Sequence, residues 1–256
     1  MDSRLYLQTV RHGSGTRLED VYCTAPYKIM RPFVRGDRID LMVMAASAGL
    51  LAGDTLDAEY RFADGSNAAV YTQGYEKVFN TGEGHVSRQT RLHVGEAAHV
   101  RFLPQPVIPF AGSDLRSQTE ITLAGSCRFA YAEIVACGRA GRGEHFQMQR
   151  LDSRLQVTVD GRMAFAEHTR LEPARINYTG LGQWQGLTHQ GLLYIYGPDW
   201  DERVLQAARQ SDALPNGLIG ASRAVQGVCV RALAASGDSL YRLFCALAAQ
   251  MEDKPQ

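Results

Sequence analysis

The chain has little lysine and no net charge, and these two shortages exclude whole classes of partner. Lysine plus arginine number 27, equal to the 27 aspartates and glutamates, and nearly all of the cations are arginine. Without net charge, no overall field draws the chain to nucleic acid or to an acidic membrane surface. Arginine makes planar, multiply bonded contacts with carboxylates, which favours protein partners.

Paired cysteines and long apolar runs are also missing. The five cysteines are scattered and form no Cys-x-x-Cys pair, and this odd number of separated thiols indicates a reducing compartment. No apolar run approaches the roughly 18 residues of a membrane span, and the amino-terminal residues lack the layout of a signal peptide. We therefore expect a cytoplasmic protein without a membrane segment.

Familiar catalytic motifs are absent as well. The sequence has no phosphate-binding G-x-x-x-x-G-K-[ST], no G-x-G-x-x-G between a strand and a helix, no H-E-x-x-H and no G-x-S-x-G. The seven histidines lack the compact spacing of a static zinc-type site. These absences disfavour nucleotide binding, hydrolysis and a tightly bound metal.

The chain does contain a long series of strand-like runs. Alternation with a period of two is typical of half-buried strands, and in residues 86–94 it places on one face Val86, Arg88, Thr90, Leu92 and Val94. Further strands are predicted within residues 1–20 and over residues 39–46, 55–62, 68–73, 97–103, 118–123, 128–136, 144–159, 162–167 and 225–232. The pairs Asp64-Gly65 and Asp160-Gly161 predict hairpin turns.

Helical periodicity appears only late in the chain. Asp199 is a candidate cap for one helix, and residues 238–254 repeat apolar side chains at helix spacing in a second. That second helix either packs on its own domain or docks a partner helix. We expect one mainly β domain over residues 1–256, with a β body over about 1–197 and a helix-bearing region over about 198–256.

Two carboxylates flank a loop of glycines and arginines. Glu133 lies in a strand-like run, and Glu144 follows the loop at residues 138–143, which is either an anion-binding nest or a surface turn. The pair could serve general acid–base chemistry, although salt bridges with nearby arginines explain the same residues. A weak, oxygen-rich site for a divalent ion could also be built from Asp54, Glu76, Glu133 or Glu144.

An ordered set of motifs resembles one protein family. The motifs are Leu50-Leu51-Ala52-Gly53-Asp54, Thr72-Gln73, Lys77, Leu103-Pro104-Gln105-Pro106-Val107-Ile108-Pro109-Phe110, Glu133, Gly138-Arg139, Gly143-Glu144-His145-Phe146, Asp160-Gly161-Arg162 and Glu167-His168-Thr169-Arg170-Leu171. Their order and spacing, from about residue 22 to residue 171, resemble the urease accessory proteins called UreD or UreH. The chain departs from the family pattern at Ala52-Gly53, usually two glycines, and at Glu167-His168, often Glu-Arg.

The resemblance implies a fold and a role. The fold is a β-helix-like stack of sheets with a pair of helices, and the role is that of a nickel-delivery scaffold, not an enzyme. Members of the family bind the accessory protein UreF and, through it, the GTPase UreG, and they contact apo-urease while its dinuclear nickel site is assembled. No cofactor is bound tightly; Ni²⁺ passes along an internal, water-filled route, with Asp54, Glu133 and Glu144 as its implied transient ligands.

The late helices are the expected contact with UreF. Apolar helix faces beyond the needs of one core mark partner surfaces, and the residues expected there are Trp200, Leu240, Leu243 and Phe244. Two other functions stay open. One is a β-helical carbohydrate-active enzyme that uses Glu133 and Glu144, against which the presence of only two tryptophans argues mildly. The other is a metal-independent, β-rich interaction module.

Overall fold

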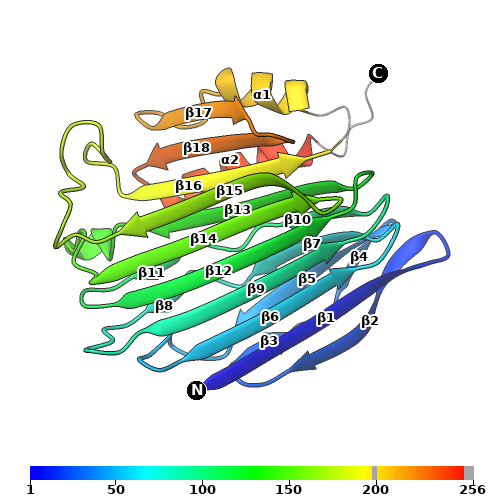
Figure 1. The fold of residues 1–256 in the computed structure, drawn as a ribbon, viewed down its shortest axis with the longest axis horizontal. Helices are drawn as coiled ribbons and strands as arrows, with labels where there is room; N and C mark the ends of the chain where they lie inside the picture. Colours follow the sequence, from blue (N-terminus) through cyan, green and yellow to red (C-terminus); the bar gives the residue numbers. More distant parts are fainter. Residues whose placement is uncertain (198–200, 251–256) are drawn as a thin grey trace.

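Two large β-sheets face each other in this protein, and two helices lie on the outside of one of them (Figure 1). The computed structural model describes residues 1–197 and 201–250. Sheet A has seven strands in the order β15-β14-β12-β9-β6-β1-β2. Sheet B has eleven strands, eight of them in the order β17-β18-β16-β13-β10-β7-β5-β3.

The strands and helices have the following bounds. Sheet A contains β1 (Asp2–His12), β2 (Gly15–Cys23), β6 (Thr55–Phe62), β9 (Val86–Val94), β12 (Asp114–Leu123), β14 (Arg150–Val159) and β15 (Arg162–Leu171). Sheet B contains β3 (Tyr27–Ile29), β4 (Phe33–Arg35), β5 (Arg38–Ala45), β7 (Asn67–Thr72), β8 (Glu76–Val78), β10 (His99–Phe102), β11 (Val107–Pro109), β13 (Arg128–Ala136), β16 (His189–Tyr196), β17 (Leu218–Arg223) and β18 (Val228–Ala234). The helices are α1 (Asp201–Arg209), α2 (Gly237–Ala249) and a short 3-10 turn, η1 (Ala140–Arg142).

The centre of the fold is a coil that the chain repeats about four times. In each coil the chain passes from a strand of sheet B to a strand of sheet A: β5 to β6, β7 to β9, β10 to β12 and β13 to β14. Each of these strands pairs in parallel with the corresponding strand of the next coil. Antiparallel strands flank the coils on both sides, with β1-β2 and β14-β15 as the outer pairs of sheet A. The predicted β-helix-like stack with two late helices is therefore confirmed.

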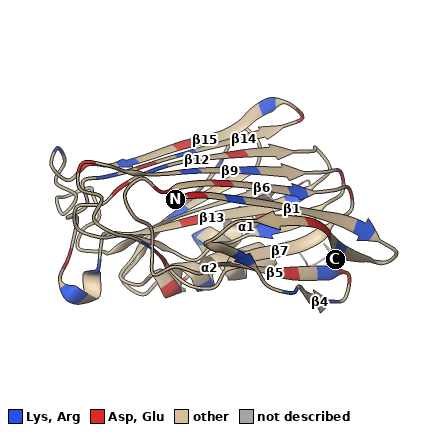
Figure 2. Cartoon of the chain, turned by 90° about the horizontal axis from the view of Figure 1, so that it is seen from below, with Lys and Arg blue, Asp and Glu red and all other residues tan. Residues whose placement is uncertain are grey.

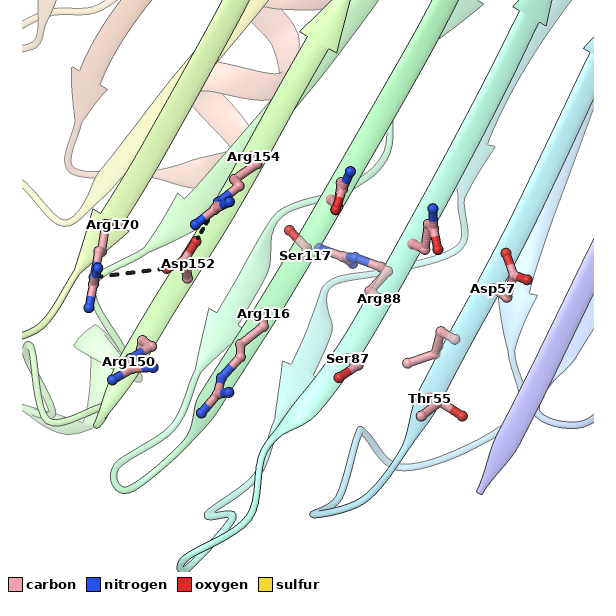
Figure 3. Close-up of a pocket in the computed structure, with 13 residues that line it drawn as sticks. Thr55, Asp57, Ser87, Arg88, Arg116, Ser117, Arg150, Asp152, Arg154 and Arg170 are labelled. Carbon is pink, nitrogen blue, oxygen red and sulfur yellow. Dashed lines mark ion pairs between the residues drawn. The ribbon is translucent and has the colours of Figure 1, made fainter.

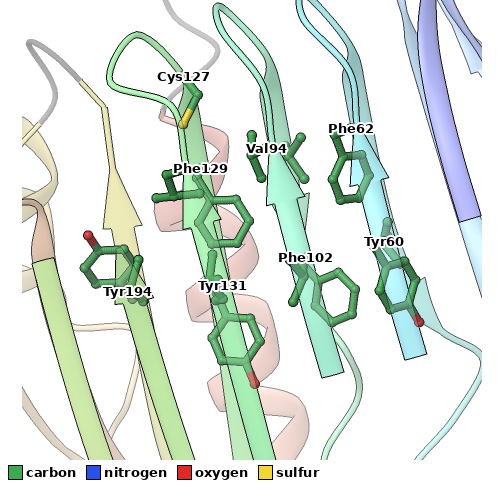
Figure 4. Close-up of a cluster of buried hydrophobic side chains, with 14 of the residues drawn as sticks. Tyr60, Phe62, Val94, Phe102, Cys127, Phe129, Tyr131 and Tyr194 are labelled. Atoms are coloured by element: carbon green, nitrogen blue, oxygen red, sulfur yellow. The ribbon is translucent and has the colours of Figure 1, made fainter. Parts of the chain in front are cut away.

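The main core fills the space between the two sheets. Aromatic rings from successive coils meet there, with 4.9 Å between the ring centroids of Tyr60 and Phe102 and 6.0 Å between those of Phe102 and Tyr131 (Figure 4). Each such pair contributes about 0.5–1.5 kcal/mol beyond the burial of its surface. Leu5 and Leu7 of β1 add their buried side chains to the same core. The coils are thus held together by a continuous ladder of side chains.

Helix α2 covers the outer face of sheet B with its apolar stripe. Leu240, Leu243 and Phe244 are buried against residues of β13, β16 and β18. These three side chains belong to the chain's own core and are not an exposed contact surface, which corrects the reason for expecting a partner at that face. Trp200 lies outside the described residues. Contact of the helix pair with a partner stays a prediction.

The structure also tests the predicted boundaries. Strands β9 and β13 have the predicted bounds, whereas the strand expected over 144–159 begins only at Arg150. Asp160-Gly161 forms the expected hairpin between β14 and β15, with φ of 48° and 74° at the two residues. The hairpin expected at Asp64-Gly65 is wrong, because that turn leads from β6 in sheet A to β7 in sheet B.

Candidate functional site

A row of polar side chains crosses the inward face of sheet A. Arg88 of β9, Ser117 of β12 and Ser153 of β14 are neighbours in register. The inward row on one side of it is apolar, with Val86, Leu115 and Leu151. On the other side a mixed row of Thr90, Thr119 and Leu155 comes first, and the apolar row of Leu92, Ile121 and Val157 follows. The polar row therefore lies between two separate hydrophobic clusters.

Sheet B contributes one carboxylate to this layer. Glu133 of β13 stands on the same face as Tyr131 and Val135, which belong to the two hydrophobic clusters. The Ser153 hydroxyl donates a hydrogen bond of 2.6 Å to Oε1 of Glu133, and the Ser117 hydroxyl donates one of 2.9 Å to the oxygen of Ser153. These two bonds form a polar connection from one sheet to the other.

A second carboxylate lies on the short strand β8. Glu76 forms an ion pair with the guanidinium of Arg88, and the two side chains are 24% and 19% exposed. The backbone N–H of Glu76 donates to the carbonyl of Pro106 at 3.0 Å, which fixes the strand that carries it. Glu76 thus lies nearer to solvent than the serine row, and Arg88 bridges the two positions.

Glu76, Arg88 and Glu133 line one cavity of about 450 Å³ between the sheets, and Ser117 and Ser153 lie outside its lining. Its wall has four tyrosines and three threonines beside the charged residues: Tyr27, Tyr60, Tyr75, Tyr131, Thr72, Thr90, Thr119, Glu76, Lys77, Arg88 and Glu133. Residues of the 47–50, 73–77 and 104–105 segments also line it, as do the mainly apolar residues Val43, Met44, Ala45, Ala58, Phe102, Val107 and Ile134. The cavity therefore combines an apolar wall with several hydroxyl groups, two carboxylates and one inward-facing arginine, and Lys77 is exposed at its edge.

The charges of the cavity are set by burial and by near neighbours. Burial raises the pKa of Glu133 above its ordinary value, and the Ser153 hydrogen bond and the Arg88 charge oppose that rise. Burial also raises the pKa of Tyr27, Tyr60 and Tyr131, so the three phenols are neutral at physiological pH. The ionisable carboxylates are thus the groups that can attract a cation here.

Asp54 occupies a different place, at the turn before β6. It is 8% exposed, and its Oδ2 accepts a hydrogen bond of 2.8 Å from the backbone N–H of Leu51. Its Oδ1 lies 2.9 Å from the amino group of Met1. Asp54 is not among the residues that line the cavity, and its contacts organise the turn.

Glu144 anchors the loop that follows η1. Its carboxylate pairs with Arg139, at 2.9 Å from the Nε atom, and accepts a hydrogen bond of 2.8 Å from the backbone N–H of Ala111. The hydrogen bond from Arg139 is the main cause of a lowered pKa at Glu144. The Arg139 guanidinium also lies 4.4 Å from the centre of the Phe110 ring. Residues 138–143 therefore form a turn that is fixed by the Arg139–Glu144 ion pair and by the contact of Arg139 with Phe110.

The structure does not bring the three predicted nickel ligands together. Within residues 1–197 and 201–250, no three His, Cys, Asp or Glu side chains are grouped as a metal site. Glu133 faces the cavity, whereas Asp54 and Glu144 each have structural partners elsewhere. The roles of all three as transient ligands stay predictions.

Arg88 is the site residue that sequence reasoning did not single out. The alternation in residues 86–94 could have indicated it, because it places the charged side chain of Arg88 on the same face as Val86, Leu92 and Val94, which are buried. An arginine on an apolar face needs a buried counter-ion. Glu76, one of the four carboxylates considered from sequence, supplies that charge.

The outer face of sheet A carries a second hollow, of about 620 Å³, rich in arginine (Figure 3). Positive and negative residues are interspersed along the strands of this sheet (Figure 2). Carboxylates bind the arginines of the hollow: Arg116 with Asp114, Arg150 and Arg170 with Glu172, and Arg154 with Asp152. The arginine side chains are 31–62% exposed and their carboxylate partners 9–16%, so the arginine charges are already paired at a partly solvated surface.

Comparison with known proteins gives one consistent family. The family model for the UreD urease accessory protein matches residues 1–255. Urease accessory protein UreH of Helicobacter pylori (strain G27) is 30% identical over 245 residues, which cover 94% of this chain and 92% of the relative. UreD of Acetivibrio thermocellus is 32% identical over 243 residues, or 93% of each chain, and UreD of Actinobacillus pleuropneumoniae is 30% identical over 256 residues, or 95% of each.

The matches extend over the coils, the cavity and both helices. Among the described residues, no helix has the length and apolar character needed to cross a bilayer. A match across nearly the whole length, together with relatives at 30% identity or more over most of the chain, establishes membership. The chain belongs to the UreD family of urease accessory proteins.

Proposed function

We propose that this chain is a urease maturation factor that acts as a scaffold, not as an enzyme. In this proposal it binds UreF, and UreG through UreF, in the cytoplasm, and the complex helps to deliver nickel to apo-urease. Family membership supports the role in urease maturation. The observation that carries the nickel step is the cavity between the two sheets, whose wall contains two carboxylates and several hydroxyl groups.

Nickel is the cargo in this proposal, and Glu133 is its foremost transient ligand. Glu133 is the inward-facing carboxylate of β13, and the hydroxyls of Ser153, Thr119 and Tyr131 lie in the same layer. Nickel prefers nitrogen ligands, so carboxylate and hydroxyl oxygens hold it weakly. Weak binding suits a carrier, because a tight site would become the destination of the ion.

Glu76 extends the path toward the mouth of the cavity. Its side chain is 24% exposed, so a hydrated ion would meet this carboxylate before Glu133. Asp54 and Glu144 remain proposed as ligands at other points of the route. Asp54 would have to exchange a backbone hydrogen bond for the ion, and Glu144 the Arg139 guanidinium.

The helix pair is the proposed contact with UreF. Since Leu240, Leu243 and Phe244 are buried, the contact would use the opposite side of α2, where Arg242 and Ala246 are exposed. Reversal of charge by Arg242→Glu leaves the core intact and tests this face directly. Retention of the UreF complex by that variant would count against contact at α2.

The proposal is tested by co-expression of the chain with UreF and UreG of the same organism. Size-exclusion chromatography measures the complex, and nickel-dependent activation of apo-urease measures the function. The expected result is a co-eluting complex that raises urease activity. No complex and no activation would overturn the proposal, and a complex that acts without nickel would favour the interaction-module alternative.

The carbohydrate-active alternative has less support. It requires Glu133 and Glu144 to share one site, but Glu133 lines the cavity beside Ser153, whereas Glu144 is bound to Arg139 outside the cavity lining. A carboxylate held in an ion pair with arginine is stabilised in its charged form and is a poor general acid.

A further inference from the structure

Arg88 is a charged side chain on a face that otherwise builds the core. Val86, Leu92 and Val94 of the same strand point the same way and are buried. Placing a guanidinium among them is costly unless it is paired and hydrogen-bonded. A neutral side chain would pack the coil with less cost, so the charge calls for an explanation beyond packing.

The surroundings of Arg88 are two carboxylates at different depths. It pairs directly with Glu76 on β8 and lies beside Ser117, whose hydroxyl leads through Ser153 to Glu133. Burial alone lowers the pKa of Arg88, but the charges of Glu76 and Glu133 raise it above its ordinary value. The guanidinium thus serves as a built-in counter-ion for both acids.

We propose that Arg88 sets how weakly the cavity holds a divalent cation, because the ion must displace its guanidinium from Glu76. This inference rests on the proposed nickel-carrying function and deepens it. An ion at Glu76 or Glu133 gains from the carboxylate but is repelled by Arg88, which is tethered to β9 and cannot leave the cavity. The arginine therefore weakens the binding of the ion and hastens its release.

The net charge of the cavity shows why a fixed arginine would matter for a carrier of nickel. Glu76 and Glu133 together supply two negative charges, and Arg88 cancels one of them. Lys77 also lines the cavity, but it is the exposed residue of β8 and not part of the buried layer. Without the arginine, two carboxylates and several hydroxyl oxygens would surround the ion. Such a cavity would retain nickel, whereas a carrier must pass it on.

The test measures nickel retention by the full chain, co-purified with UreF. Equilibrium dialysis gives the Ni²⁺ dissociation constant, and transfer to a chromogenic chelator gives the release rate. We expect Arg88→Met to bind Ni²⁺ about tenfold more tightly or better, and to release it correspondingly more slowly, since a tenfold change matches a shift of about one pKa unit for a neighbouring charge. The matched control is Arg91→Met, on the outward face of the same strand, where Arg91 pairs with Asp57.

A measurement on the unmodified chain covers the case in which Arg88→Met fails to fold. Phenylglyoxal modifies accessible arginines, and mass spectrometry of the digest reports each site. Addition of Ni²⁺ should increase modification of Arg88, because the ion releases it from Glu76, and should leave Arg91 unchanged. Equal modification of Arg88 with and without Ni²⁺ would overturn the inference.

The outcomes separate this inference from the proposed function. In one case the parent chain binds Ni²⁺, Glu133→Gln binds it more weakly, and Arg88→Met binds it no more tightly than the parent. That result refutes the role of Arg88 and leaves the nickel-carrying cavity supported. If neither the parent nor Arg88→Met takes up Ni²⁺, the cavity carries no nickel and both fall.

Discussion

The hydrogen bond from Ser153 to Glu133 is the connection between the sheets that can be tested most sharply. Its length is 2.6 Å and its acceptor is a carboxylate on the inward face of β13. Ser153→Ala removes this bond and leaves the Ser117 hydroxyl without its acceptor. Because Ser153 is 4% exposed, solvent does not readily replace either partner.

The expected cost follows from the kinds of bond that are lost. A hydrogen bond to a charged group is worth about 1.5–3 kcal/mol, and a neutral bond about 1 kcal/mol. Ser153→Ala should therefore lower the free energy of unfolding by about 3 kcal/mol, which for a chain of this size lowers Tm by roughly 6–12 °C. Ser117→Ala is the matched control, since it removes only the neutral bond and should cost about 1 kcal/mol.

A double-mutant cycle identifies the bond itself. Urea unfolding of Ser153→Ala, Glu133→Met and the double variant gives the coupling free energy between the two positions, since methionine, unlike glutamine, removes the oxygen that accepts the bond. We expect coupling of about 1–2 kcal/mol, because the charged acceptor and its donor act together. Additivity within about 0.5 kcal/mol would refute the polar connection between the sheets.

Three further predictions concern other parts of the chain. Burial lowers the pKa of His99 from 6.5 to about 4, so on acidification the unfolded chain binds a proton before the folded chain does. The free energy of unfolding should therefore fall by up to about 3 kcal/mol between about pH 6.5 and about pH 4. Thermal scans over this pH range should show a smaller fall for His99→Gln. Phe244→Ala should cost about 3–5 kcal/mol in urea unfolding, since the buried ring packs against the bare backbone of Gly191, where a Cβ would lie 2.6 Å from it. Arg139→Met should destabilise the chain at neutral pH, and this difference should vanish in acid, because the lowered pKa of Glu144 stabilises the fold only where the carboxylate is ionised. A pH-independent difference would contradict that account.

Much of the coil was predictable because its strands contrast with the turns around them. Residues 86–94 and 128–136 were bounded correctly, since the first run begins and ends with buried valines on its inward face and the second is buried on both faces. The strand expected from residue 144 failed because Glu144 is held by Arg139 in a loop and Phe146 adopts a φ of 52°. Local alternation contains no information about this ion pair or about the hydrogen bond that Ala111 donates to Glu144.

The turns show the same limit. Asp64-Gly65 and Asp160-Gly161 carry the same dipeptide, yet the first leads to the opposite sheet and the second closes a hairpin. The difference arises from parallel stacking of coils, which involves residues far apart in the sequence. Similarly, the sequence indicated which carboxylates exist, but only the register of β9, β12 and β14 shows that Arg88, not Asp54, accompanies Glu133.

The measurement that tests the central claim most directly compares Glu133→Gln with Glu120→Gln in the assembled complex. Glu120 lies on β12, outside the cavity lining, and therefore controls for the loss of one carboxylate. Both variants should co-elute with UreF and UreG, and only Glu133→Gln should reduce nickel-dependent urease activation, by about tenfold or more. Full activation by Glu133→Gln would contradict the account, because nickel would then pass without the one carboxylate that β13 places in the cavity.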